Sequence, residues 1–169
     1  EHKQVILKNY ASSHTGVARD RLVEPFGFTT NYVQVWCYEP ESGLNKLFNT
    51  SRIASIEVLN EDWQFAEEHR EGKIDIFRIN GFEQKRVQVE LGMIAHNLLI
   101  EEYPLATRDL TQIDKNHWLL DTMVCDYVGI GRFVIGLMND IRILTPEFEK
   151  YITTTVNGMY ERCNKISNK

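Results

Sequence analysis

Three basic residues in the first third of the chain, Arg21, Lys46 and Arg52, could hold a phosphate or another anion. A guanidinium group offers a fork of N–H donors to phosphate oxygens, and an ammonium group adds a compact charge. We therefore predict an anion site built from these side chains. In the alternative interpretation, Arg21 forms an ion pair with Glu24 or Asp20 at the rim of its sheet.

The floor of this predicted site comes from the segment 32–38, which reads as a strand. Successive side chains of a strand point to opposite faces, so Val33, Val35 and Cys37 form one set that can face a core. The other set comprises Tyr32, Gln34, Trp36 and Tyr38. Because aromatic rings stack on bases, we expect this second face to bind a flat ligand. The alternative is that Trp36 packs under a second domain.

A polar loop follows Tyr10 and contains Ser12, Ser13 and His14. As part of a ligand site, these residues would offer hydroxyl and imidazole donors to a phosphate. As ordinary turn residues, they need no partner beyond the local backbone.

Catalytic and metal-binding patterns are missing from the sequence. It contains no Gly-x-Ser-x-Gly element, and its five histidines form no His-x-x-x-His pair. Gly129, Gly131 and Gly136 are spaced like a nucleotide loop, but no phosphate-binding lysine follows and no parallel βαβ unit surrounds them. We predict a protein that is not an enzyme and that has neither a metal site nor a cofactor.

Charge is distributed unevenly along the 169 residues. The net charge is -5, which argues against a surface that coats nucleic acid indiscriminately. Residues 1–52 hold six Lys/Arg and five acids, whereas the remainder holds 13 Lys/Arg and 19 acids. Any anion-binding site should therefore lie in the first third.

The cellular location is suggested by what the chain lacks and by its cysteines. No run of 18 apolar residues occurs, and the N-terminus has no signal-peptide core. Cys37, Cys125 and Cys163 are widely spaced in apolar or helical patterns, which predicts buried thiols in a reducing cytoplasm. Since the first residue is Glu, we expect a piece of a longer protein.

The first 72 residues read as short strands at hairpin spacing. The expected strands are 3–10, 21–29, 32–38, 46–48 and 53–59, followed by a short helix within 60–68 that Asn60 caps. Such spacing is typical of a small closed β-barrel. We assign residues 1–72 to this barrel and residues 73–85, with their charged approach, to a linker.

From residue 86 onward, strands and helices alternate. Strands are expected at 86–91, 117–125 and 141–144, with a further strand near 110–114. A helix is expected at 93–102, and apolar residues from Ile130 to Leu137 predict a second. Thr145 caps a final helix whose buried stripe is Phe148, Ile152, Val156 and Met159. This order predicts an α+β chain, a barrel followed by a ferredoxin-like domain over 86–169.

Several short elements resemble a known family. Tyr10-Ala-Ser-Ser, Arg21-Leu-Val-Glu-Pro-Phe and Phe48-Asn-Thr-Ser-Arg52-Ile53 are similar to a WYL domain, which has an Sm-like, SH3-like barrel. Gly131-Arg-Phe-Val-Ile-Gly-Leu and Ile141-Arg-Ile-Leu-Thr-Pro-Glu-Phe resemble the C-terminal extension (WCX type) that follows it in bacterial transcription factors. The name-giving triplet is replaced by Val33-Gln34-Val35, and Lys46 and Asn49 stand where the family has arginine.

The resemblance implies a ligand-sensing and dimerisation fragment of a cytoplasmic, DNA-binding transcriptional regulator. The implied ligand-binding residues are Tyr10, Ser12, Ser13, His14, Arg21, Tyr32, Gln34, Trp36, Lys46, Asn49 and Arg52. The implied effector is a nucleotide or a short single-stranded nucleic acid. DNA would be contacted through an N-terminal helix-turn-helix outside this sequence, and the chain would form a homodimer.

Two other functions fit the same residues. The barrel could be an Sm-like module that grips single-stranded nucleic acid directly, with an affinity that salt weakens steeply. It could instead be a scaffold that has lost its ligand, as Gln34, Lys46 and Asn49 suggest.

Overall fold

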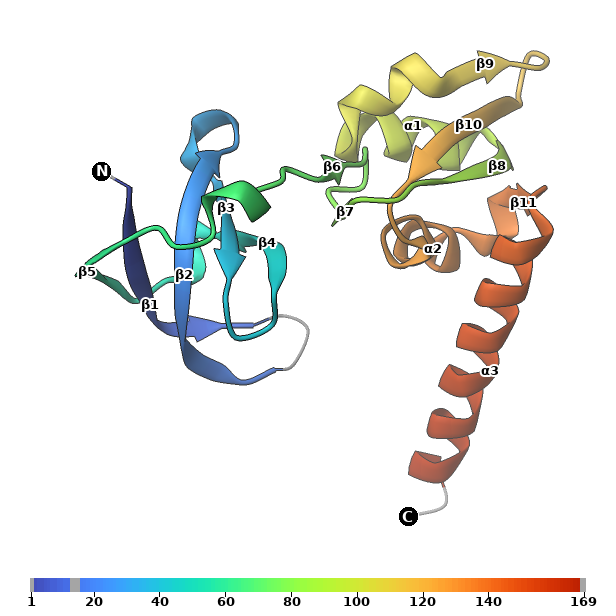
Figure 1. Cartoon of the computed structure of the whole chain (residues 1–169). Coiled ribbons are helices and arrows are strands. Elements are labelled where there is room, and N and C mark those ends of the chain that lie inside the picture. Colours follow the sequence, from blue (N-terminus) through green and yellow to red (C-terminus); the bar gives the residue numbers. More distant parts are fainter. Residues whose placement is uncertain (1, 13–15, 168–169) are drawn as a thin grey trace. The chain divides into compact units, whose positions relative to one another are not determined.

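The computed structural model describes residues 2–12 and 16–167 and shows a mixed α+β chain with antiparallel sheets (Figure 1). The chain divides into two compact units, Glu1–Gly72 and Lys73–Lys169. In the part that the structure describes, no helix is long and apolar enough to cross a membrane.

The N-terminal unit is a single five-stranded antiparallel sheet in the order β4-β3-β2-β1-β5. Its strands are β1 (Lys3–Ala11), β2 (Ala18–Phe28), β3 (Gln34–Glu39), β4 (Leu44–Asn49) and β5 (Ser55–Asp62). One-turn 3-10 helices are η1 (Thr30–Tyr32), η2 (Thr50–Arg52) and η3 (Ala66–Glu68). β-Branched and aromatic residues favour these strands, and bulges interrupt the pairing of β1 with both neighbours.

The predicted closed barrel is not formed. Among the described residues β4 hydrogen-bonds only to β3, and β5 only to β1, so both remain edge strands. A barrel needs its first and last strands to pair, and here η2 connects β4 and β5 without a ladder between them. The predicted helix within 60–68 is also wrong, because β5 continues to Asp62 and only η3 is helical.

Both faces of this sheet are covered near β3. The inner face holds a compact core of Val5, Leu7, Tyr10, Val23, Val35, Cys37 and Phe48. On the outer face, the segment 63–70 packs over β2 and β3. Its rings contact the sheet through Tyr38–Phe65, with centroids 5.2 Å apart, and Phe26–His69, 4.5 Å apart. Residues of β3 are therefore buried on both sides.

The C-terminal unit has a four-stranded antiparallel sheet in the order β11-β8-β10-β9. Its strands are β8 (Lys85–Leu91), β9 (Leu110–Gln112), β10 (Trp118–Val124) and β11 (Ile141–Ile143). Its helices are α1 (Met93–Glu102), η4 (Pro104–Asp109), α2 (Tyr127–Gly136), η5 (Met138–Asp140) and α3 (Pro146–Ser167). Apolar residues of β8, β10 and the three α-helices form one core.

Residues 73–85, expected as a linker, contain the small hairpin of β6 (Lys73–Ile74) and β7 (Asn80–Gly81). Asp75 organises this hairpin by accepting hydrogen bonds from the amides of Phe77 and Ile79, each 2.9 Å long. The ring of Phe77 enters the core of the C-terminal unit.

Two of the three glycines of α2, Gly129 and Gly131, allow close packing, whereas a Cβ added at Gly136 would meet nothing within 4 Å. An added Cβ at Gly129 would lie 2.7 Å from the Cβ of Phe77, and one at Gly131 would lie 2.9 Å from the ring of Tyr151. Any larger side chain would push these neighbours apart, because interiors have no spare volume. Their spacing therefore serves helix packing within this unit.

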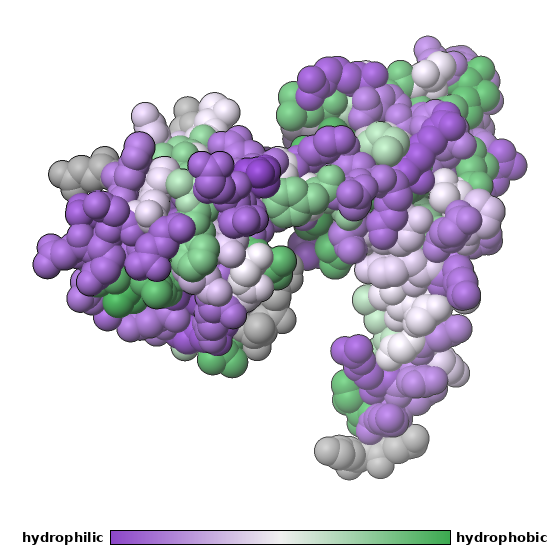
Figure 2. All heavy atoms as spheres, in the orientation of Figure 1, coloured by the Kyte–Doolittle hydropathy of each residue, from purple (hydrophilic) through white to green (hydrophobic). Residues whose placement is uncertain are grey.

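Helix α3 corrects two predictions. Phe148 and Ile152 are buried as predicted, but Val156 and Met159 are exposed. Cys37 is buried, Cys125 is half-buried and Cys163 is exposed on α3, so burial of all three cysteines was also wrong. Of the described residues of α3, the core of the unit includes Phe148, Tyr151 and Ile152, so Val156, Met159 and Cys163 lie beyond it, and Figure 2 shows hydrophobic atoms at the helix surface.

Candidate functional site

A pocket of about 440 Å³ opens on the inner face of the N-terminal sheet. It is lined by Val5, Leu7, Pro25, Phe28, Val35, Thr50, Ile53, Ser55 and Ile56. These residues come from β1, β2, β3, β5, the turn η2 and Ile53, which follows η2. The pocket therefore lies on the face of the sheet that would be the interior of a closed barrel. Ligand pockets in proteins measure about 300–1,000 Å³, and this one falls within that range.

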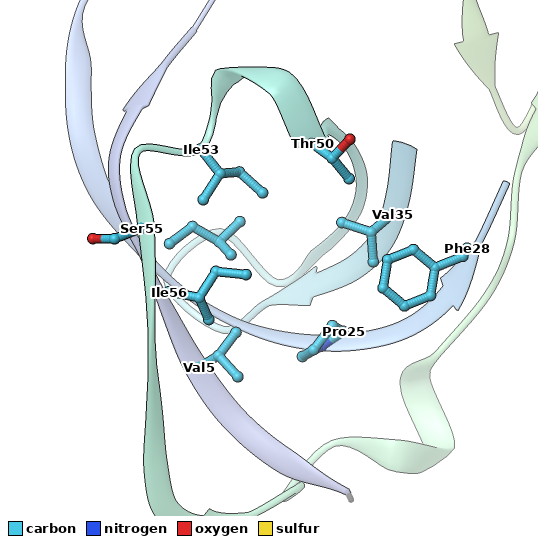
Figure 3. A pocket seen from close by; sticks show the side chains of 9 residues that line it. Val5, Pro25, Phe28, Val35, Thr50, Ile53, Ser55 and Ile56 are labelled. Atoms are coloured by element: carbon cyan, nitrogen blue, oxygen red, sulfur yellow. The ribbon is translucent and has the colours of Figure 1, made fainter. Parts of the chain in front are cut away.

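The lining offers hydrocarbon and almost no polar atom. Thr50 and Ser55 are its only hydroxyl-bearing members, and Figure 3 shows both oxygens directed away from the space between the other side chains. The Thr50 hydroxyl lies 2.9 Å from the carbonyl oxygen of Tyr32 and 3.0 Å from that of Val33. An occupant would therefore gain from burying apolar surface.

Tyr32 lies beside this pocket, in a conformation that bulky residues rarely adopt. Its φ is +56°, and 71% of its surface is exposed. Its ring meets Phe28, a lining residue, edge to face at 5.3 Å. Tyr32 belongs to η1 and not to the strand predicted for 32–38, so it does not share a face with Trp36. Left-handed backbone costs a non-glycine residue about 1–2 kcal/mol, and such strain clusters at ligand-binding sites.

The cations Arg21 and Lys46 converge on one buried carboxylate. Glu39 is 1% exposed, and one of its oxygens accepts a 2.9 Å hydrogen bond from Nη1 of Arg21. Its other oxygen pairs with Nζ of Lys46 and accepts a 2.7 Å hydrogen bond from the hydroxyl of Ser42. Burial alone would raise the pKa of Glu39, but hydrogen bonds from Lys46, Ser42 and Arg21, together with the charge of Lys46, outweigh it. The pKa is therefore lowered.

This cluster answers the question left open for Arg21. Its partner is Glu39 on the neighbouring strand β3, and neither Glu24 nor Asp20. Among the described residues, Nε of Arg21 is buried without a hydrogen-bond partner, so Glu39 satisfies only part of the guanidinium. With two cations and one carboxylate, the cluster keeps a formal charge of +1, but it is largely covered.

The predicted aromatic floor is covered by the chain itself. Trp36 is 3% exposed, and Tyr38 packs against Phe65 and His69. A base could stack on Trp36 only after its cover had moved. Tyr32 and Trp36 are therefore separated, one exposed beside the pocket and the other buried.

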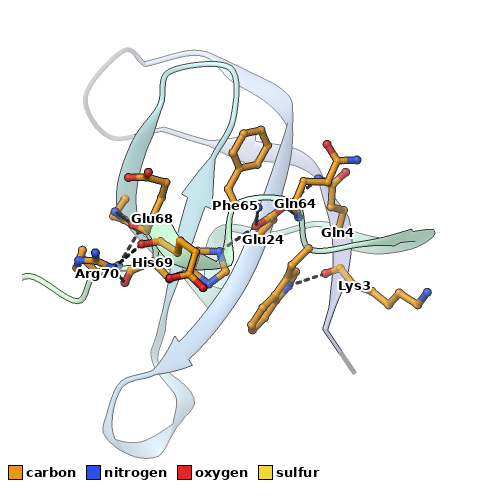
Figure 4. A network of polar contacts seen from close by, with 11 residues as sticks. Lys3, Gln4, Glu24, Gln64, Phe65, Glu68, His69 and Arg70 are labelled. Atoms are coloured by element: carbon orange, nitrogen blue, oxygen red, sulfur yellow. Dashed lines mark hydrogen bonds and ion pairs between the residues drawn. The ribbon is translucent and has the colours of Figure 1, made fainter.

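Glu24 holds the covering segment in place (Figure 4). This fully buried carboxylate accepts hydrogen bonds from Nε2 of Gln4 at 2.9 Å and from the amides of Gln64 and Phe65 at 2.6 and 3.1 Å. Nε2 of His69 lies 2.9 Å from it. Burial would raise the pKa of Glu24, but these four hydrogen bonds outweigh it and lower the pKa.

The remaining predicted site residues fall into smaller groups. The backbone N–H of Asn49 donates a hydrogen bond to the hydroxyl oxygen of Tyr10 at 3.2 Å. Asn49 of β4 lies opposite Gln34 of β3 in the sheet register. The Ser12 carbonyl accepts from the amide of Gly16, and Arg52 is exposed in η2. Ser13 and His14 lie outside the described residues.

Sequence reasoning missed the lining residues of the pocket and the roles of Glu24 and Glu39. An acid inside an apolar strand was the available signal for each buried carboxylate, since an acid there needs partners. Nothing local marks the pocket, because its walls come from five separate segments. Among the described residues, no group of His, Cys, Asp or Glu is arranged to hold a metal ion.

No protein-family model matches this chain, and no curated protein does. Among solved structures, it is similar to proteasome accessory factor B/C (PafBC) of Arthrobacter aurescens, with 19% sequence identity and a TM-score of 0.39. The similarity covers 90% of this chain and 24% of that one, so the chain spans about a quarter of its length. A likeness at this level does not assign a function.

Proposed function

We propose that this chain is the effector-sensing part of a transcriptional regulator, and that a small molecule occupies the inner-face pocket of its N-terminal unit. The observation that carries this proposal is the pocket itself, a ligand-sized space with an apolar lining. The strained Tyr32 beside the lining residue Phe28 supports it. Such an effector acts only if it binds two states of the regulator with unequal affinity.

The same proposal includes the finer fold assignments. A meander from β1 to β4, with β5 returning beside β1, supports an Sm-like unit over residues 1–72. The order β8-α1-β9-β10-α2-β11 with antiparallel pairing supports a ferredoxin-like unit in the C-terminal part. Binding of DNA through a region outside this sequence, and the cytoplasm as its place, remain part of the proposal.

The nucleotide-type effector and the ligand residues predicted from the sequence stay a prediction. Three of these residues have other contacts in the folded chain, because Arg21 and Lys46 both pair with Glu39 and the ring of Trp36 is buried. Nucleotides, cyclic dinucleotides and short single strands therefore belong in every titration panel beside apolar compounds.

An uncharged fluorescent probe tests the pocket. We expect N-phenyl-1-naphthylamine to bind the wild-type chain saturably, with a rise in fluorescence, because the lining buries its rings. Ile56→Trp should lower the affinity at least tenfold, since Ile56 lines the pocket and a larger side chain fills it. Val58→Trp is the matched control, because Val58 lies two residues further along β5 outside the lining. Equal binding to both variants would refute this site.

Self-association is the second part of the proposal, and we place it on one stripe of α3. Val156, Met159, Cys163 and Ile166 recur at intervals of three and four residues and are all exposed, the pattern by which two helices pair. We expect sedimentation equilibrium to show a dimer whose dissociation constant rises at least tenfold in Met159→Glu. Asn157→Glu adds the same charge off the stripe and should leave it unchanged. A monomeric wild type at every concentration would contradict this assignment.

A further inference from the structure

The pocket of the N-terminal unit has two walls, which come from two different pairs of strands. Leu7 and Ile56 are register partners on β1 and β5. Phe28 and Val35 are register partners on β2 and β3. All four line the pocket, and Figure 3 shows Ile53 and Ile56 across the space from Phe28 and Val35. An aliphatic wall therefore faces a wall that carries one aromatic ring.

One large apolar side chain on each wall remains exposed to water. Phe28 is 60% exposed and Ile56 is 58% exposed, although both line the same pocket. The ring of Phe28 is oriented by its edge-to-face contact with Tyr32 at 5.3 Å. Single exposed apolar residues are common, but apolar side chains that gather on one hollow mark a binding site. An occupant between the walls would cover both side chains.

The lining offers no partner to a charged group. No described lining residue has an ionisable side chain. The hydroxyl of Thr50 already donates to backbone carbonyl oxygens of Tyr32 and Val33. A carboxylate or an ammonium group that entered this space would lose its water and gain no hydrogen bond in return, which is costly. The lining therefore favours an uncharged occupant.

We infer that the pocket binds an uncharged aromatic compound, whose ring lies between Phe28 and the aliphatic wall. The inference rests on the proposed function and adds the chemical class of its effector. Burial of the ring against Ile53 and Ile56 supplies affinity through apolar area. Contact between two aromatic rings adds to what area alone provides, because their edges and faces carry opposite partial charges.

Four ligands test this class by displacing N-phenyl-1-naphthylamine from the whole chain at pH 7, with calorimetry as a second readout. They are 2-naphthylmethanol, 2-naphthoate, 2-naphthylmethylammonium and the saturated decahydro-2-naphthylmethanol. We expect 2-naphthylmethanol to bind at least tenfold more tightly than either ion, because only the ions must lose the hydration of a charge. It should also bind at least threefold more tightly than the saturated alcohol, which lacks the aromatic ring.

One substitution isolates the aromatic wall. Phe28→Leu keeps the wall apolar and removes its ring, so the two alcohols should then bind within twofold of each other. The saturated alcohol should bind this variant within twofold of the wild type, which shows that the pocket is intact. Tyr160→Leu is the matched control, because it removes an exposed ring on α3 in the other unit. It should bind all four ligands like the wild type.

The possible results distinguish this inference from the proposed function. If either ion binds as tightly as 2-naphthylmethanol, the uncharged class is refuted while the pocket remains an effector site. If the saturated alcohol binds the wild type equally well, or if Phe28→Leu keeps the preference for the aromatic alcohol, the aromatic class is refuted. If neither the fluorescent probe nor any of the four ligands binds, both proposals fail.

Discussion

Glu39→Ala should destabilise the N-terminal unit by about 3–5 kcal/mol, because it leaves the buried guanidinium of Arg21 without its countercharge. Arg21 is 7% exposed and bonds to Glu39 at 2.9 Å. Lys46 and Ser42 lose the same partner. Urea unfolding followed by tryptophan fluorescence measures the change, since Trp36 and Trp63 both lie in this unit.

Two comparisons isolate the buried charge as the cause. Glu41→Ala removes an exposed carboxylate that lies 3.6 Å from Arg19 and should cost less than about 1 kcal/mol. The double variant Arg21→Met with Glu39→Met should be more stable than Glu39→Ala, because it removes both buried charges together. A loss below about 1 kcal/mol in Glu39→Ala would show that water replaces the carboxylate, and that the cluster is less closed than its burial indicates.

Glu24→Ala should have an effect of similar size, about 3–5 kcal/mol, and should also release the segment 63–70 from the sheet. The substitution removes the buried acceptor of three hydrogen-bond donors, which are the side chain of Gln4 and the backbone N–H groups of Gln64 and Phe65. His69 loses its partner as well. Amide hydrogen exchange within 63–70 should accelerate in this variant, while Glu61→Ala, an exposed change on β5, should leave it unaltered.

The pH dependence of stability provides a second readout for Glu24. Its pKa is lowered from an ordinary value of 4.5, so its stabilising contribution is complete above that pH and is lost as pH falls through the folded value. Stability differences between wild type and Glu24→Ala measured at neutral pH should therefore shrink in acid. A difference that persists unchanged below pH 4.5 would mean that the carboxylate charge is not what holds this segment.

Much of the secondary structure could be predicted from local patterns. β-Branched and apolar residues marked β1, alternation marked β3 and β8, helical spacing marked α1 and α2, and the capping Thr145 marked the start of α3. The mixed α+β class followed from the same patterns and is confirmed. These features depend on near neighbours in the chain, and their energies are local.

The site was less predictable, because it depends on which segments lie against which. Trp36 and Tyr38 have the alternation of a solvent-exposed strand face, yet both are buried, and Tyr38 packs against Phe65 and His69 of the returning segment 63–70. Arg21 and Lys46 look like ligand cations until Glu39, on the neighbouring strand, is placed between them. A charge pattern in sequence cannot tell a partner inside the protein from one outside it.

The amino-acid sequence alone determined most of the strands and helices and the higher proportion of basic residues in the first third, since these follow from residue type and short-range spacing. Tertiary structure alone decided that the five-stranded sheet stays open and that an apolar pocket forms beside Tyr32. It also decided that Arg21 and Lys46 form ion pairs with the buried carboxylate of Glu39. Each of these outcomes depends on contacts between residues far apart in the chain. Their balance of burial, charge and hydrogen bonding is set only when the strands come together.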